Sequence, residues 1–324
     1  MMNARKDYYM VLDTETATLP FANRISEGDE KVKQNIAIAK PLVYDFGWVI
    51  IDRQGNIVEK VEYLVQETFF VPNVFNTAYY KDKRPIYMDM LDKGEIEPKN
   101  WKAILTECVK KAKMCKAVCA YNAAFDFKKA IAFTDRYINA LYSADYNEWE
   151  RKQYGACMAI KRGKKDFHNE DYLTPYWSIM GEEFPIVDLW EVACDKLLNT
   201  DRYRKFCLDN EYWTASATYF KTSAEIAYRY LMKENDFIEA HTALDDAIIE
   251  SQILAKALRK GKVNPCIGSF PFRILGGTVE YACEKEHPAM ESLYDCLYEQ
   301  FCKASSPSYA SKLENLVDML QSAM

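Results

Sequence analysis

The sequence has few residues of the kinds that mark membrane, fibrous or disordered chains. Gly and Pro occur only 11 times each in 324 residues, and no segment repeats or is compositionally simple. The longest apolar stretches, such as Trp48–Ile51, are far shorter than the roughly 18 residues of a membrane-spanning helix. The N-terminal residues also lack the apolar region and cleavage site of a secretory signal. We therefore expect a folded, cytoplasmic protein that makes no contact with a membrane.

Paired cysteine motifs are missing as well. Ten cysteines are present, but none forms a CxxC pair and most lie in apolar segments. Hydrophobic residues make up 49% of the chain, so a core can form without disulfide bonds. We interpret the cysteines as reduced core thiols.

The chain also lacks the excess of positive charge that many nucleic-acid-binding proteins carry. Its formal net charge is -6. This acidity does not exclude a nuclease, because active-site carboxylates contribute to it. Bound divalent cations would reverse the local charge that a phosphate meets.

The pattern of apolar residues predicts strands and helices in a definite order. Alternation and short apolar runs predict strands, and helical spacing predicts helices. The predicted strands are residues 7–13, 42–51, 58–65, 117–121 and 184–190, and the predicted helices are residues 101–115, 127–142, 222–233 and 244–258. This order predicts the α/β class, with a mixed five-stranded sheet flanked by helices. It is similar to the order in the ribonuclease H-like fold.

Two parts of the chain are expected. Residues 1–260 would form the main domain, with an aromatic and basic insertion at about residues 143–183. Residues 261–324 have their own turn signals and would form a small, mainly helical C-terminal accessory region. That region is either a docking surface for a protein partner or plain core.

Two acidic residues stand at the end of the first predicted strand. Asp13 and Glu15 are two positions apart, and alternation along an extended chain points them to the same side. Two carboxylates therefore face one candidate site. The same pattern alone is also typical of an exposed strand end.

A third carboxylate follows the fourth predicted strand. Asp126 ends the segment Asn122–Asp126, and Phe125 is expected to be buried beneath it. An aspartate at a helix N-terminus also has a structural explanation, because it stabilises the helix dipole by roughly 0.3 to 1 kcal/mol. Its position directly after a buried strand makes it a candidate for chemistry.

A histidine and two aspartates open the last predicted helix. Thr242 and Asp245 fit the Thr-x-x-Asp arrangement of a helix N-cap, which gives Asp245 a structural role. Asp246 is then available for chemistry, and His241 lies just outside the first turn. A lone histidine is more often structural than catalytic, so the interpretation depends on the whole set.

Taken together, these segments resemble the histidine branch of the DnaQ-like (DEDDh) exonucleases. Residues 13–16 are similar to the first family motif, residues 122–126 to the second and residues 241–247 to the third. One branch of the family has histidine five residues before the last aspartate, and another has tyrosine four residues before it. Residue 241 is His and residue 242 is Thr, which indicates the histidine branch and selects Asp246 as the ligand.

The resemblance, over about residues 7–258, implies a metal-dependent 3'-to-5' exonuclease. Four carboxylates would hold two divalent cations, Mg2+ or Mn2+, and His241 would take a proton from the attacking water. The implied metal ligands are Asp13, Glu15, Asp126 and Asp246. The expected substrates are single-stranded 3' ends, DNA favoured over RNA, and the expected products are nucleoside 5'-monophosphates.

The resemblance also suggests contacts to the terminal nucleotide. The candidates are Thr14, Thr16, Ala17, Asn122 and Phe125. Family members commonly continue with Thr-Gly after the first motif, whereas this chain has Ala-Thr at residues 17 and 18. The chain therefore departs from the family where these contacts are expected.

The long segment between Asp126 and Asp188 interleaves cations with aromatic residues. This pattern suits single-stranded nucleic acid, because stacking contributes roughly 1 to 3 kcal/mol per base. We hypothesise that the segment grips the strand upstream of the scissile bond, and the candidate contacts are Lys161, Arg162, Lys164 and Lys165. The alternative is a solvated lid whose aromatic residues pack on the body.

Two other functions remain open at this point. An RNA-trimming exoribonuclease of the same fold would share all five site residues, and only pocket details sense the 2'-hydroxyl. A non-catalytic scaffold in a replication, recombination or defence complex would keep the fold without cleaving. The sequence does not decide between these functions.

Overall fold

The computed structural model describes residues 8–164, 174–214 and 218–278, and the single positions 281, 315 and 318. The chain divides into two compact units. The first contains the described residues of 1–189 and 239–268, and the second those of 190–238 and 269–324. The sequence placed a boundary after residue 260, whereas the structure groups residues 190–238 with the later part of the chain. Most of the expected C-terminal helical region lies outside the described residues.

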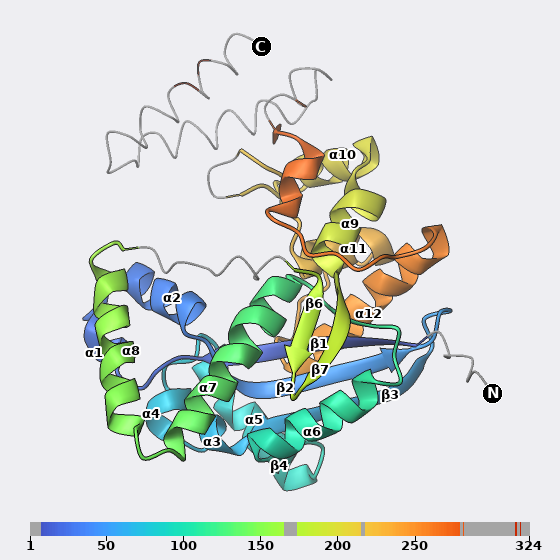
Figure 1. Cartoon of the computed structure of the whole chain (residues 1–324). Helices are drawn as coiled ribbons and strands as arrows, with labels where there is room; N and C mark the ends of the chain where they lie inside the picture. The colour runs from blue at the N-terminus through green and yellow to red at the C-terminus, as the bar shows by residue number, and fades with distance from the viewer. Residues whose placement is uncertain are drawn as a thin grey trace, which may run out of the picture. The chain divides into compact units, whose positions relative to one another are not determined.

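A seven-stranded mixed sheet forms the centre of the first unit (Figure 1). The strands are β1 (Tyr9–Ala17), β2 (Leu42–Ile51), β3 (Ile57–Val65), β4 (Glu97–Lys99), β5 (Ala117–Ala120), β6 (Tyr176–Ile179) and β7 (Glu182–Asp188), in the spatial order β4-β3-β2-β1-β5-β7-β6. The first three pair antiparallel, as hairpin-linked strands do. β5 pairs parallel with both β1 and β7, so β1, β5 and β7 have their carboxyl ends at the same edge.

The sheet has seven strands and not the expected five. The five predicted strands all form, and the two additional ones are short edge strands. β4 has only three residues and includes Pro98, which an edge strand tolerates. β6 pairs antiparallel with β7 across Met180 and Gly181, both of which have positive φ. Neither strand has a long enough alternating pattern to be recognised from its sequence.

Helices cover the sheet on both faces. On β2, Phe46 packs edge-on against Trp101 of one helix, whereas the neighbouring Asp45 accepts a hydrogen bond from Ala243 of another. Side chains alternate along a strand, so these two helices lie on opposite faces. All ten residues of β2 are buried as a result. The helices of this unit are α1 (Ala22–Ser26), α2 (Glu30–Ala39), α3 (Gln66–Phe69), α4 (Pro72–Phe75), α5 (Arg84–Lys93), α6 (Trp101–Ala112), α7 (Ile131–Leu141), α8 (Tyr146–Lys161) and α12 (Ala243–Lys260), with a 3-10 turn η1 (Lys81–Lys83) and a π-helix η2 (Ala124–Ala130).

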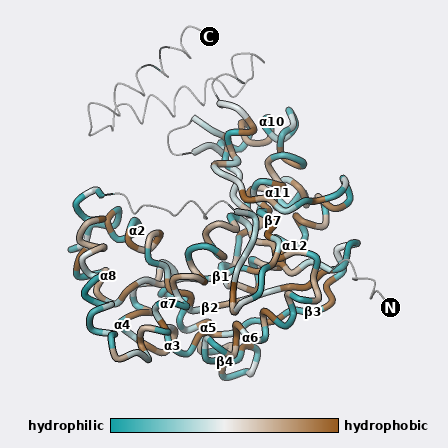
Figure 2. Tube along the Cα trace, viewed as in Figure 1, coloured by the Kyte–Doolittle hydropathy of each residue, from teal (hydrophilic) through white to brown (hydrophobic). Residues whose placement is uncertain are grey.

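Local signals explain several of these helices. Asn100 accepts a hydrogen bond from Ala103 N and so begins α6, whose buried residues recur at helical spacing. Asp29 does the same for Val32 N at the start of α2. Figure 2 shows hydrophobic and hydrophilic stretches within single helices, as expected for helices with one face on a core.

The second unit has its own core. Its helices are α9 (Leu189–Ala193, which begins at the unit boundary), α10 (Asp201–Asp209) and α11 (Ala224–Met232), with a π-helix η4 (Cys194–Leu198) and a 3-10 turn η5 (Pro271–Leu275). Rings of Tyr203, Phe206 and Tyr230 pack against one another, and Trp190 stacks on Phe272. This aromatic packing joins residues 190–238 to residues after 269.

Two further predictions concern cysteines and membrane spans. The seven described cysteines are thiols outside disulfide bonds, and five of them are buried, which agrees with the thiol interpretation for that part of the chain. Among the described residues, no helix has the length and apolar character needed to cross a membrane.

Candidate active site

Strand β1 presents Asp13 and Glu15 at one edge of the sheet. Both side chains are partly exposed. Leu12, which precedes Asp13, and Thr14, which lies between the two acidic residues, are buried, as the alternation of a strand predicts. The register between β1 and β2 shifts between Glu15 and Thr16, so the strand is irregular where its acidic residues lie. Such irregularities re-aim side chains at the ends of strands.

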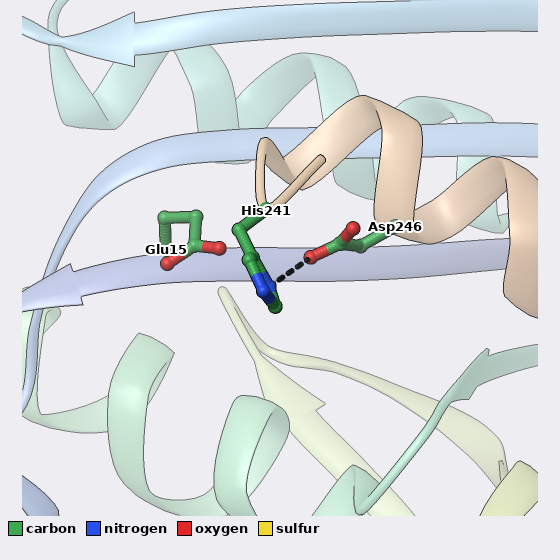
Figure 3. Close-up of side chains that lie close together, drawn as sticks. All are labelled: Glu15, His241 and Asp246. Carbon is green, nitrogen blue, oxygen red and sulfur yellow. Dashed lines mark ion pairs between the residues drawn. The ribbon is translucent and has the colours of Figure 1, made fainter. Parts of the chain in front are cut away.

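The structure brings Glu15, His241 and Asp246 together (Figure 3). One possible ligand atom from each residue lies within 4.8 Å of the others. His241 Nδ1 is 3.8 Å from Asp246 Oδ2. The residues come from β1, from the segment just before α12 and from the first turn of α12, so the group forms only in the folded chain.

Asp126 lies in the π-helix η2 and is almost completely buried, at 3% exposure. The hydroxyl of Thr14 donates a hydrogen bond of 2.7 Å to Asp126 Oδ1 and so joins β1 to η2. Thr14 was a candidate for contact with the terminal nucleotide through its backbone groups, and its hydroxyl holds the carboxylate of Asp126. Phe125 is only partly buried, and Asn122 is exposed with φ 67°. Asp126, and not Phe125, is thus the deeply buried residue of this motif.

The electrostatics show how closely these carboxylates are grouped. Burial and then the charges of Asp126, Glu250 and other acidic groups raise the pKa of Asp13 well above its usual range. Burial, followed by the charges of Asp246 and Asp45, also raises the pKa of Glu15. Like charges in a poorly solvated site each disfavour ionisation of the others.

The same effects act on the two aspartates that face β1. Burial raises the pKa of Asp126 to about 7, opposed by the hydrogen bond from Thr14. Burial and then the charge of Glu239 raise the pKa of Asp246 to about 8. Clustered groups with strongly raised pKa values are typical of functional sites, although structural networks produce them too.

Glu250 is a further buried carboxylate, and it was not among the residues predicted from the sequence. It is 3% exposed and accepts a hydrogen bond of 3.1 Å from Tyr121 N. Burial raises its pKa, and the charges of Asp126 and Asp246 raise it further. Glu250 follows Asp246 by four residues on α12, so the helical period places both on one face. That spacing was a usable signal.

His241 is held from several sides. Its φ is 54°, in the left-handed region, and its ring stacks on Tyr80 with centroids 4.4 Å apart. Lys83 donates hydrogen bonds to the carbonyl oxygens of Ala240 and His241. Glu239 lies 3.5 Å from His241 Nδ1. No pattern in the sequence pointed to Tyr80 or Lys83, because they lie at the two ends of the three-residue turn η1.

The N-terminus of α12 is anchored to the sheet. Thr242 Oγ1 accepts a hydrogen bond from Asp245 N, which confirms the predicted N-cap. Asp45 Oδ2 accepts from Ala243 N at 2.9 Å, and Glu62 Oε1 accepts from Leu244 N at 3.2 Å.

Gly47 allows the helix to approach this closely. A Cβ at residue 47 would lie 2.5 Å from backbone atoms of Ala243 and Leu244, which is too close for any larger residue. The sheet therefore fixes the helix end that presents His241 and Asp246.

The remaining predicted contacts differ in exposure. Ala17 is 1% exposed and belongs to the core, whereas Thr16 is partly exposed. In the insertion, Lys161 forms an ion pair of 3.0 Å with Glu27. Arg162 and Lys164 are exposed, and Lys165 lies outside the described residues.

The aromatic residues of the insertion divide into two groups. Trp149 packs against Phe133 and Tyr137 of α7, and Trp177 packs against Phe127 and Phe184. These rings support the body, as the lid alternative predicts. Other tyrosines of the segment remain exposed, and they are Tyr142, Tyr154 and Tyr176.

Comparison with known proteins assigns no family to the chain. No protein-family model matches the chain, and the searches of curated proteins and of solved structures found no significant match.

Proposed function

We propose that this chain is a metal-dependent 3'-to-5' exonuclease that acts on single-stranded nucleic acid, DNA favoured. The observation that carries the proposal is the compact group of Glu15, His241 and Asp246. Further buried carboxylates extend this group. A hydrolase that uses divalent cations and a histidine base requires this combination of groups.

The residues fit divalent cations. Asp246 Oδ1 is buried and has no hydrogen-bond partner among the described residues. The carboxylates raise one another's pKa, and Lys83 is the basic side chain that opposes this for Glu15 and Asp246. Carboxylate oxygens are hard ligands that suit Mg2+ or Mn2+. We infer that two ions would be held by Asp13, Glu15, Asp126 and Asp246.

The fold and motifs support the same proposal. The inner strands run in the order β3-β2-β1-β5-β7, with β1 to β3 antiparallel and β5 and β7 parallel to β1. We interpret this arrangement as a ribonuclease H-like core with one added strand at each edge. The three motifs that resemble the DEDDh exonucleases all lie in this unit.

In the proposed mechanism, His241 takes a proton from the attacking water. An imidazole suits this role because its ordinary pKa of about 6.5 is near neutral. Bound cations would supply a more acidic water and would stabilise the charge that develops on the phosphate and on the leaving 3' oxygen. Tyr80 and Lys83 hold the histidine, and Asp45 and Glu62 hold the helix that carries Asp246. The products would be nucleoside 5'-monophosphates.

Two alternatives are tested together with this proposal. An RNA-trimming exoribonuclease would use the same residues on a ribose substrate. A scaffold that binds nucleic acid without cleaving it would keep its fold and its binding when the carboxylates are neutralised.

The test is incubation of the purified protein with 5'-labelled single-stranded DNA and RNA, in Mg2+, Mn2+ or EDTA. Asp13→Ala and Asp246→Asn variants serve as controls. We expect a metal-dependent ladder that shortens from the 3' end and is absent in both variants. Preference for RNA would identify the exoribonuclease, and cleavage of neither strand by the wild type would favour the scaffold.

A further inference from the structure

A cavity of about 540 Å³ lies between the segment after β1, α4 and α8, apart from the residues of the candidate site. Its lining combines two rings, two guanidinium groups and two carboxamides. These are Phe21, Arg24, Asn73, Asn147, Arg151 and Tyr154. The cavity is formed within the first unit, where α8 contacts α1 (Figure 1).

The cavity is lined by one buried ring and one accessible ring. Phe21 is 8% exposed, whereas Tyr154 is 37% exposed. The two rings meet edge to face with centroids 5.4 Å apart, so Phe21 supports Tyr154 from one side. The guanidinium of Arg24 lies 5.6 Å from the centroid of the Tyr154 ring. A supported, accessible ring beside a guanidinium suits the stacking of a nucleobase.

The charges favour an anionic ligand. Arg24 and Arg151 are both exposed, and neither forms an ion pair with a carboxylate among the described residues. Glu150 also lines the cavity and is the opposing charge. The guanidinium geometry matches the oxygens of a phosphate diester, and the carboxamides of Asn73 and Asn147 both donate and accept hydrogen bonds, as base edges require.

The cavity is within reach of the candidate site. Pro20 lines it, and Glu15 lies five residues earlier in the chain. Five residues span at most about 18 Å even when fully extended. A single strand whose 3' end lies at Glu15 can therefore reach the cavity within a few nucleotides.

We propose that this cavity binds one nucleotide of a single strand, upstream of the 3' end. Tyr154 stacks on its base, and Arg24 and Arg151 contact the flanking phosphates. This assignment rests on the proposed exonuclease function for its orientation. The proposed contacts to the strand are then made by Tyr154, Arg24 and Arg151. The sequence-based hypothesis gave them to Lys161, Arg162, Lys164 and Lys165. The assignment also separates the exposed Tyr154 from the insertion aromatics that only pack on the body.

Binding is measured in EDTA, so that the result is independent of cleavage. A labelled oligodeoxythymidylate is titrated with wild-type protein and followed by fluorescence anisotropy at several salt concentrations. Tyr154→Ala should weaken binding by about 10-fold, whereas Tyr154→Phe should retain most of the affinity, because the ring is what stacks. The Arg24→Ala and Arg151→Ala double variant should reduce the slope of log affinity against log salt by about 1.4, as expected for two lost phosphate contacts on a single strand.

Lys152→Ala is the matched control. It removes the same charge from the adjacent position of α8, where Lys152 pairs with Glu148 and does not line the cavity. Unchanged affinity in the Tyr154→Ala and double Arg variants, with folding verified by circular dichroism, would overturn the subsite. Equal weakening by Lys152→Ala would also overturn it, because it would show a diffuse charge effect.

A small substrate separates this proposal from the exonuclease proposal. The p-nitrophenyl ester of thymidine 5'-monophosphate carries only the terminal nucleotide, with p-nitrophenol as the leaving group, and has no upstream nucleotide to place in the cavity. Its hydrolysis in Mn2+ should be the same in the wild type and in all cavity variants. No hydrolysis by the wild type would contradict the exonuclease proposal while leaving the binding result intact, and loss of hydrolysis only in the cavity variants would overturn the subsite by placing these residues in the catalytic machinery.

Discussion

The first unit holds two groups of acidic residues, and their carboxylates have different partners. Asp45 and Glu62, the helix-anchoring pair, accept hydrogen bonds from Tyr87, Ala243 and Leu244. The site carboxylates are Asp13, Glu15, Asp126, Asp246 and Glu250. Their largest neighbouring charges are those of other carboxylates.

The two groups share one feature. Asp45 Oδ1 and Asp246 Oδ1 are both buried without a hydrogen-bond partner among the described residues. Burial raises the pKa of both Asp45 and Glu62, and the hydrogen bonds from Ala243 N and Leu244 N oppose this rise. Two acids can be stabilised by one proton and several donors. Five neighbouring carboxylates repel one another, and on the proposed function divalent cations would neutralise this repulsion.

Neutralising a site carboxylate should have the largest effect. Asp13→Asn or Asp246→Asn should reduce nucleotide release by at least about 1,000-fold, because a lost ligand removes several kcal/mol of transition-state stabilisation. The same variants should be more stable than the wild type in EDTA, because one of the mutually repelling charges is gone. Release of nucleoside monophosphates and chemical unfolding in EDTA measure the two effects. Lower stability in EDTA for both variants would contradict the repulsion.

Substitutions in the helix-anchoring pair should lower the free energy of unfolding by the same amount with and without divalent cations. Asp45→Ala leaves Tyr87 and Ala243 N without their acceptor, which should cost about 3 kcal/mol of unfolding free energy. Asp45→Asn keeps an acceptor oxygen and should cost less. Urea unfolding with and without Mg2+ measures this, and a loss that appears only in Mg2+ would place Asp45 in the cation site.

Tyr80 should affect turnover more than substrate binding. Tyr80→Ala removes the ring that stacks on His241, and we expect kcat to fall about 10-fold, because general-base catalysis depends on the position of the base. Tyr80→Phe keeps the ring and should restore most of kcat. Steady-state kinetics on a short oligonucleotide separates kcat from KM. A rise in KM alone would instead make Tyr80 a substrate contact.

The cation-free protein should lose stability as pH rises. The folded-state pKa values of Asp126 and Asp246 are raised, to about 7 and about 8, so the folded chain binds more protons than the unfolded chain above the ordinary value of 3.8. Stability is then greatest below the ordinary pKa and falls as pH rises through the raised values. Thermal unfolding in EDTA between pH 4 and 8 measures the slope. Stability that rises across this range would show that other groups dominate.

The sequence contained strong signals for the parts of the fold with regular periods. β1, β2, β3 and α12 follow from alternation, helical spacing and the Thr242 cap. The alternation also put Asp13 and Glu15 on the same side of the first strand, although β1 does not end at these residues but continues to Ala17. Glu250 was within reach of the same helical reasoning. The short edge strands β4 and β6 have too few residues to show a period.

Other features depend on packing between distant segments. Asp45 looks like any residue of a buried strand, and its partner Ala243 lies 198 positions away in the chain. Tyr80 and Lys83 lie at the two ends of the short 3-10 turn η1, which has too few residues to show a period. The cavity beside Tyr154 requires α1, α4 and α8 to meet, which no local pattern encodes.

The contrast between the helix-anchoring pair and the site carboxylates is tested most directly by thermal unfolding of three proteins, each in EDTA and in Mn2+. These are the wild type, Asp246→Asn and Asp45→Asn. A ligand that binds only the folded state raises the unfolding temperature. We predict that Mn2+ raises the Tm of the wild type and of Asp45→Asn by similar amounts and changes that of Asp246→Asn little. No shift in the wild type, or an equal shift in Asp246→Asn, would contradict the assignment of the site carboxylates to divalent cations.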